Sequence, residues 1–214
     1  MKKLVLFDLD GTLLDTLEDL GASVDHALAK RGLPMHTTEE YRHMVGHGIR
    51  NLVTQALPVE SRTDDALVDA ALADFKTHYS ADIDLKTRPY PGMQALLTDL
   101  QGAGMRMAVA SNKFQEGAEY LVREFFPDID FVDILGNRPG FPLKPSPEIV
   151  EEVLAKAGID KADAVLVGDS PTDMRTAANG GIDAIAVSWG YRSVEELAGN
   201  RLVRSVEELR SALL

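Results

Sequence analysis

The N-terminal stretch KKLVLFDLDGTLLDT constrains the fold most, because it joins a buried strand to two closely spaced acids. Residues 4–7 are all apolar, which is typical of a strand covered on both faces in a parallel sheet. Asp8 and Asp10 follow at a spacing of two, so on extended backbone both carboxylates point the same way. Neighbouring like charges repel. The stretch therefore predicts a strand that ends in a site where two acids are needed together.

The rest of the chain repeats the strand pattern with helical segments between the strands. Four later segments are expected to be buried strands: 105–111, 131–135, 163–169 and 183–189. This alternation predicts an α/β fold with a Rossmann-like parallel sheet. Ser146 and Ser170, each followed by proline, predict helix starts, and so does the repeated SVEEL at 193–197 and 205–209.

Residues 16–82 break the alternation, because they contain no convincing strand. They predict a small all-helical domain inserted after the first strand, with residues 1–15 and 83–214 forming the α/β core. The hinges are expected near 14–16 and in 82–92, where prolines stop a helix. Four helical stretches are expected in the insert: 17–32, 37–45, 48–57 and 64–80.

Composition excludes several classes of function. The 214 residues include 22 Lys and Arg against 34 Asp and Glu, a net charge of −12, which disfavours binding to nucleic acid or to an anionic membrane. Cysteine is absent, so disulfides and thiolate nucleophiles are excluded. No apolar run is long enough for an export signal or a membrane span. We expect a soluble cytoplasmic protein, a monomer or a homodimer, that acts on a small molecule.

Polar residues collect at the ends of the expected strands, where ligands bind in open parallel sheets. They are Asp8, Asp10 and Thr12 after the first strand, Ser111 and Asn112 after the second, Lys144 after the third, and Asp169 and Asp173 after the fourth. Each alone has an ordinary structural explanation, such as a turn, a helix cap or a surface lysine. Their joint placement at one sheet edge predicts a catalytic site.

In this order, DLDGT, SN, KP and GDSPTD resemble the four motifs of the haloacid dehalogenase-like (HAD) hydrolase superfamily, and the helical insert resembles its cap. The resemblance covers the whole chain. It implies a phosphatase in which Asp8 attacks phosphorus to form an aspartyl-phosphate. Asp10 would protonate the leaving group and then activate water.

The same resemblance implies a bound Mg²⁺. Its ligands would be the carboxylates of Asp8 and Asp169 and the backbone carbonyl of Asp10, with Asp173 acting directly or through water. Residues expected to bind substrate in the core are Thr12, Ser111, Asn112 and Lys144.

In the insert, MVGHGIRNLVTQALP resembles the Gly-x-Gly cap signature of bacterial phosphoglycolate phosphatases, and GYRSVEEL is similar to another part of them. This resemblance implies that Gly46, His47 and Gly48 contact the substrate, with Arg50 pairing with its carboxylate. A helix–helix turn with His47 and Arg50 facing solvent is an equal alternative. 2-Phosphoglycolate is the leading substrate, while pyrophosphate, other small monoesters and 5′-nucleotides stay open.

Two other functions compete. A β-phosphoglucomutase-like enzyme shares every core motif, but such members carry a cap histidine where this chain has Leu20. A receiver domain of a signalling system also combines acids, a hydroxyl and a lysine. The inserted cap and Asp10 oppose that interpretation, because they serve water exclusion and proton transfer.

Overall fold

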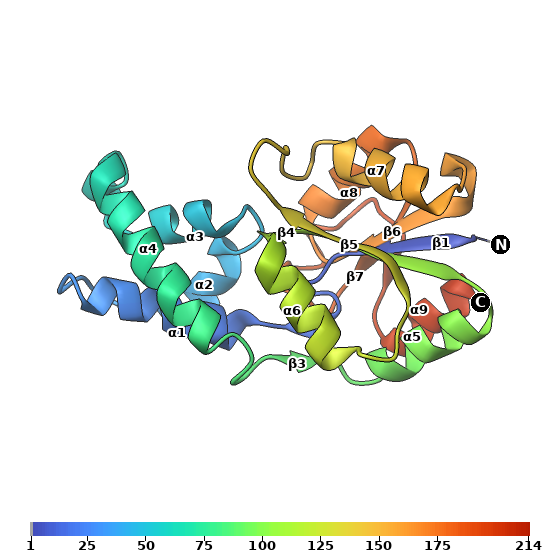
Figure 1. Cartoon of the computed structure of the whole chain (residues 1–214), viewed down its shortest axis with the longest axis horizontal. Helices are drawn as coiled ribbons and strands as arrows, with labels where there is room; N and C mark the ends of the chain where they lie inside the picture. Colours follow the sequence, from blue (N-terminus) through green and yellow to red (C-terminus); the bar gives the residue numbers. More distant parts are fainter. Residues whose placement is uncertain (1) are drawn as a thin grey trace.

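A computed structural model describes residues 2–214, and it has two parts with the cap on one side and both chain ends on the other (Figure 1). The core is a six-stranded sheet in the order β5-β4-β1-β6-β7-β8, in which every neighbouring pair is parallel. The strands are β1 (Leu4–Phe7), β4 (Arg106–Phe114), β5 (Phe131–Asn137), β6 (Ala164–Gly168), β7 (Asp183–Val187) and β8 (Leu202–Val203).

The central strand β1 is apolar throughout because each of its faces packs on helices. Val5 and Phe7 belong to one buried cluster, and Leu4 and Leu6 belong to the other, as the alternation of a strand requires. The first face is covered by α5 (Met93–Gly102), α6 (Gln115–Phe125) and α9 (Val206–Leu213). The second is covered by α7 (Glu148–Ala157) and α8 (Pro171–Gly180). The predicted α/β class is confirmed.

Three features of the strands and helices differ from what the sequence predicts. β4 runs on to Phe114, three residues past the predicted end. α7 begins at Glu148 with Pro147 at its cap, so Ser146 lies one residue too early to cap it. Ser193 and Glu196 exchange the hydrogen bonds of a capping box, but only turns follow, whereas Ser205 does cap α9. A capping sequence thus forms its local bonds without ensuring a helix.

The inserted segment is entirely helical, as expected. It contains α1 (Leu17–Ala29), α2 (Thr38–Met44), α3 (Ile49–Ala56), the short 3₁₀ turn η1 (Val59–Ser61) and α4 (Asp65–Ala81). A second 3₁₀ turn, η2 (Lys161–Asp163), lies in the core before β6. Thr37 and Glu40 form the predicted capping box of α2.

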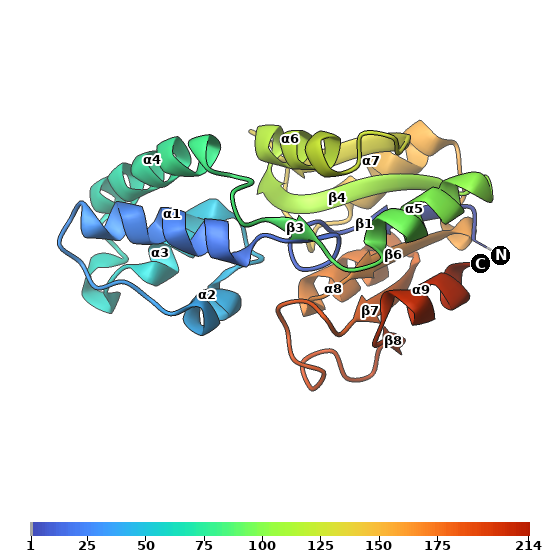
Figure 2. The ribbon, with the colours of Figure 1, turned by 90° about the horizontal axis from the view of Figure 1, so that it is seen from below.

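The two connections between cap and core run antiparallel to each other (Figure 2). β2 (Leu14–Asp15) pairs with β3 (Arg88–Pro89) there. The buried Asp19 of α1 accepts hydrogen bonds from the backbone N–H groups of Lys86 and Thr87 and from the Thr87 hydroxyl. These bonds tie the returning chain to the start of the cap. Between residues 2 and 214, no helix has the length and apolarity to cross a membrane.

Candidate active site

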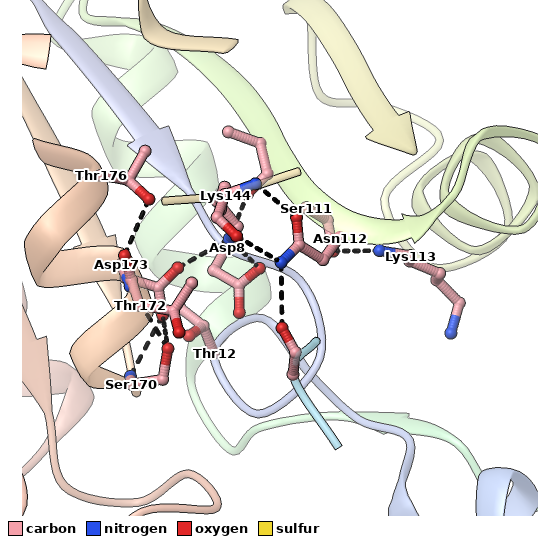
Figure 3. A network of polar contacts seen from close by, with 12 residues as sticks. Asp8, Thr12, Ser111, Asn112, Lys113, Lys144, Ser170, Thr172, Asp173 and Thr176 are labelled. Atoms are coloured by element: carbon pink, nitrogen blue, oxygen red, sulfur yellow. Dashed lines mark hydrogen bonds and ion pairs between the residues drawn. The ribbon is translucent and has the colours of Figure 1, made fainter. Parts of the chain in front are cut away.

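The site is built around Lys144, whose ammonium lies among acids at the carboxyl end of the sheet (Figure 3). Its Nζ donates to Asp8 Oδ1 at 2.7 Å, to Asp173 Oδ1 at 2.6 Å and to the carbonyl of Ala110 at 2.7 Å. Asp8 follows β1, the strand at which the chain order reverses between β4 and β6. Such a switch point is where open α/β sheets bind ligands.

The acids of this cluster outnumber the cations around them. Burial raises the pKa of Asp8 well above its ordinary value, and Asp173 and Asp169 raise it further against the opposing effect of Lys144. Burial and the neighbouring Asp173 raise the pKa of Asp169 to about 7. Burial by itself would lower the pKa of Lys144, but Asp173 and Asp8 together raise it. The cluster therefore lacks positive charge.

Oxygens of Asp8, Asp169 and Asp173 lie within 4.8 Å of one another, close enough for one cation to contact all three. Asp169 is held by the backbone N–H of Tyr191 at 2.6 Å. Gly11 has a φ of +89°, and a Cβ there would lie 2.5 Å from Asp169 Oδ2, so this turn needs glycine. A cluster of carboxylate oxygens that lacks positive charge suits Mg²⁺, which prefers oxygen ligands.

Asp10 belongs to a separate set of contacts, facing the cap. Its Oδ1 accepts hydrogen bonds from Thr16 Oγ1 at 2.6 Å and from Lys113 Nζ at 3.0 Å. Thr16 is fixed in turn by the Tyr191 hydroxyl, which accepts from its backbone N–H at 2.8 Å. The two acids spaced by two residues are therefore held by different lysines, Asp8 by Lys144 and Asp10 by Lys113.

Asn112 connects the core to the cap. Its Nδ2 donates to the carbonyl of Gly46 at 3.0 Å and to that of Lys144 at 3.2 Å, and its Oδ1 accepts from the Lys144 backbone N–H at 2.8 Å. Ser111 lies beside it and lines the same pocket as Asp8. Ser111 thus places a hydroxyl in the pocket, and Asn112 bonds both the segment of Lys144 and the cap segment of Gly46.

The cap loop, residues 45–48 between α2 and α3, and the start of α3 contribute backbone and apolar side chains to this pocket. Gly46 and Gly48 line it, and so does Ile49 at the start of α3. His47 does not belong to the lining; its pKa is lowered by burial and by the nearby Arg192. Arg50 is not brought to the site, because it pairs with two acids of α4, Asp65 at 3.1 Å and Asp69.

Thr12 also lies outside the lining, and its hydroxyl reaches only Asp169, at 3.5 Å. All the other core residues singled out in the sequence do line the pocket: Asp8, Asp10, Ser111, Asn112, Lys144, Asp169 and Asp173. Asp173 also stabilises the start of α8, because its Oδ2 accepts hydrogen bonds from the backbone N–H and hydroxyl of Ser170 in a capping box.

Nine lining residues were not among the sequence candidates, and Lys113, Tyr191 and Arg192 are three of them. Lys113 had a usable signal, because it follows Ser111 at a spacing of two and continued extension would aim both side chains the same way. Arg192 had none, since it donates to the backbone carbonyls of Arg42 and Val45 in the cap, contacts that only the folded chain creates.

The arrangement offers a carboxylate that can act as a nucleophile beside a group of acids that suits a cation, a second carboxylate held by a different lysine, and a lysine and a hydroxyl for anionic oxygens. These are the parts that phosphoryl transfer needs: an in-line nucleophile, charge neutralisation and a proton donor. The remaining wall is apolar, with Leu20, Ile49 and Leu52 from the cap, so water is displaced when the pocket fills.

Comparison with known proteins agrees with this geometry. The family model described as haloacid dehalogenase-like hydrolase matches residues 5–187. A phosphoglycolate phosphatase of Mesorhizobium japonicum is 35% identical over 211 residues, which is 97% of this chain and 93% of the relative. One from Agrobacterium fabrum is 34% identical, with coverage of 91% of this chain and 84% of the relative.

Solved structures agree as well. The crystal structure of an inferred phosphoglycolate phosphatase from Lactobacillus delbrueckii superposes with a TM-score of 0.92 at 34% identity, covering 100% of this chain and 99% of the other. The structure of CbbY from Rhodobacter sphaeroides in complex with phosphate has a TM-score of 0.77 at 27% identity, covering 98% and 96%. This chain belongs to the haloacid dehalogenase-like hydrolases.

Proposed function

We propose that the protein is a Mg²⁺-dependent phosphatase that hydrolyses 2-phosphoglycolate through an aspartyl-phosphate on Asp8. The observation that carries this proposal is that two acids spaced by two residues pair with different lysines: Asp8 with Lys144 in the cluster of acids, and Asp10 with Lys113. The full-length likeness to several phosphoglycolate phosphatases supports the choice of substrate.

In the first step the free carboxylate oxygen of Asp8 forms a bond to phosphorus and the bond from phosphorus to the bridging oxygen breaks. Asp10 gives its proton to that oxygen, so glycolate leaves as an alcohol. Ser111 donates to the other phosphoryl oxygens, and Lys144, hydrogen-bonded to Asp8, adds positive charge beside the nucleophile. Mg²⁺, bound by Asp8, Asp169, the Asp10 carbonyl and Asp173, would supply positive charge between the anionic nucleophile and the anionic phosphate.

In the second step Asp10, now deprotonated, takes a proton from water while the water oxygen attacks phosphorus. The bond from phosphorus to Asp8 breaks, and phosphate leaves. Asp10 is suited to both steps because Thr16 and Lys113 hold its Oδ1, and its carboxylate is not part of the cluster of Asp8, Asp169 and Asp173. The apolar cap wall keeps other water from the aspartyl-phosphate until glycolate has left.

A sugar-phosphate mutase is less well supported. Leu20 lines the pocket at the position where such mutases carry a cap histidine, and an aliphatic side chain cannot exchange protons with a sugar hydroxyl. A mutase would return phosphate to a sugar, whereas a phosphatase gives it to water.

The test is a panel of phosphate esters assayed with Mg²⁺: 2-phosphoglycolate, pyrophosphate, hexose phosphates and 5′-nucleotides. We expect the highest kcat/KM for 2-phosphoglycolate and release of free phosphate. Transfer to glucose phosphate, or a clear preference for nucleotides, would overturn the assignment. Acid quenching should trap a hydroxylamine-sensitive phosphoenzyme in the wild type, and Asp8→Asn should form none.

A further inference from the structure

Lys113, at the end of β4, is a second buried lysine in the pocket, and the reaction steps above give it only one task. Its side chain is 1% exposed and lies beside Asp10 and beneath the cap. In Figure 3 it extends away from the cluster formed by Asp8, Lys144 and Asp173. A lysine so deeply buried needs anionic or strongly polar partners, because a desolvated ammonium is costly.

Two such partners are present. Nζ donates to Asp10 Oδ1 at 3.0 Å and to the hydroxyl of Tyr79 at 2.6 Å. Tyr79 lies on cap helix α4, wholly buried, and its ring stacks on Phe75 with centroids 5.3 Å apart. Nζ lies 4.7 Å from the Tyr79 ring centroid, within range of a cation–π contact. The ammonium is therefore held at a fixed point where core and cap meet.

Lys144 and Lys113 differ in how many of their N–H donors form hydrogen bonds within the protein. An ammonium has three N–H donors. Lys144 directs its three to Asp8, Asp173 and a backbone carbonyl. Lys113 directs two to Asp10 and Tyr79, and since it lines the pocket, its third is available to a ligand there.

The position of Lys113 relative to Asp10 decides which part of a ligand it would meet. Asp10, as proton donor, must lie within hydrogen-bond reach of the bridging oxygen of the phosphate ester. Lys113 Nζ is 3.0 Å from that carboxylate, and its side chain extends away from the cluster of Asp8, Lys144 and Asp173 (Figure 3). Its third donor therefore faces the leaving group rather than the phosphoryl group. In phosphoglycolate the carboxylate carbon is two bonds from the bridging oxygen.

The other cations near the pocket are held by contacts within the cap or between cap and core. Arg50 pairs with Asp65 and Asp69 on the surface of the cap. Arg192 is engaged with the carbonyls of Arg42 and Val45, so its guanidinium holds the end of α2. The cap side of the pocket is otherwise aliphatic, with Leu20, Ile49 and Leu52. A carboxylate entering beside Asp10 meets Lys113, the cation that is hydrogen-bonded to Asp10.

We propose that Lys113 is the specificity-determining residue of this enzyme: it binds the carboxylate of the leaving group and so selects phosphate esters that carry an anion next to the bridging oxygen. This inference rests on the proposed function. Tyr79 would position the ammonium from the cap, so that the carboxylate is bound only when the cap is closed over the core. Recognition of the substrate's anion would thereby be coupled to exclusion of water.

The test compares 2-phosphoglycolate with isobutyl phosphate, whose isopropyl group has the shape of the carboxylate without its charge. The ratio of kcat/KM for the two esters is measured for the wild type and for Lys113→Met, which keeps the length of the side chain and removes the ammonium. We expect the ratio to fall about 100-fold, mainly through KM for phosphoglycolate, because loss of a buried charge pair typically has an effect of this order. The matched control is Lys76→Met, an exposed lysine of α4, which should leave the ratio unchanged.

The outcomes separate the two proposals. A wild type that does not prefer phosphoglycolate to isobutyl phosphate overturns the proposed function and this inference with it. A wild type with that preference, and a Lys113→Met variant that loses activity equally on both esters, overturns this inference alone, because Lys113 would then act only through Asp10. The same holds if the preference is lost in Arg192→Gln and kept in Lys113→Met. If Lys113→Met does not fold, Lys113→Gln replaces it in the same comparison.

Discussion

The phosphate side of the pocket and the cap side are built by different means. On the phosphate side, side chains pair with side chains: Lys144 joins Asp8 and Asp173, and all three are buried. On the cap side, the contacts run largely through backbone, with the Gly46 carbonyl bound by Asn112 and the end of α2 bound by Arg192. The charged side chain at the start of α3, Arg50, faces away from the pocket.

This difference separates reaction from substrate choice. A buried ion-pair cluster tolerates few substitutions, because removing one partner leaves an uncompensated charge. A backbone contact places little demand on which side chain occupies the position. On the proposed function, the reacting groups and Lys113 are core side chains, while the cap limits the shape of the pocket and keeps water out. The predictions below test that division, and those on the phosphate side should have the largest effects.

Asp8→Asn should have the largest effect, because it removes the attacking oxygen's charge. Turnover should fall by a factor on the order of 10⁴ or more with every ester, since no other group can accept the phosphoryl group. Steady-state phosphate release measures it, and circular dichroism confirms the fold. Retained hydrolysis of an aryl phosphate would disprove the nucleophile assignment.

Asp10→Asn should have a smaller effect that depends on the leaving group. With phosphoglycolate or an alkyl phosphate we expect a loss of roughly 10²- to 10⁴-fold, the usual contribution of a proton donor. With p-nitrophenyl phosphate, whose leaving group needs no proton, formation of the phosphoenzyme should slow far less. An equal penalty for aryl and alkyl esters in a rapid-quench experiment would contradict the acid role.

Mg²⁺ should change how thermal stability depends on pH. With chelator present, the pKa of Asp169 is about 7 in the folded protein against 3.8 as its ordinary value, so the folded state binds extra protons between these values. Stability therefore falls as pH rises through that window. Saturating Mg²⁺ should raise the melting temperature by several degrees at pH 7.5 and less at pH 5.

Differential scanning fluorimetry at both pH values, with Mg²⁺ and with EDTA, measures this effect. Asp169→Asn is the control, because it removes the charge that the cation would balance. A wild type that gains as much at pH 5 as at pH 7.5 would show that these acids do not bind the ion.

Arg50→Ala should have the smallest effect and marks the boundary of the site. Its pairs with Asp65 and Asp69 are on the surface, where ion pairs contribute little. We expect kcat/KM for phosphoglycolate to change by less than about twofold, with an equal result for an aryl phosphate. A rise in KM confined to phosphoglycolate would restore Arg50 as a carboxylate partner and weaken the case for Lys113.

The sequence alone was sufficient for the α/β class, the helical insert and seven of the core residues that line the pocket. Each of these follows from local rules: apolar runs become strands, the carboxyl ends of parallel strands meet at one edge, and polar residues placed there converge. Even so, the capping box of Ser193 and Glu196 is followed only by turns, and α7 begins one residue later than the Ser146 signal predicts, because a cap alone does not make a helix.

Only the tertiary structure decided which charged groups pair with one another. Nothing in the order of residues shows that Asp8 takes Lys144 while Asp10 takes Lys113, or that Arg50 turns to Asp69 while Arg192 reaches the cap. The physical reason is that a side chain several bonds long can point in many directions, and burial selects the one direction in which its charge is compensated. The motif residues could be predicted because backbone geometry places them at the strand ends, whereas the pairing of Lys113 with Asp10 and Tyr79 arises only when cap and core pack together.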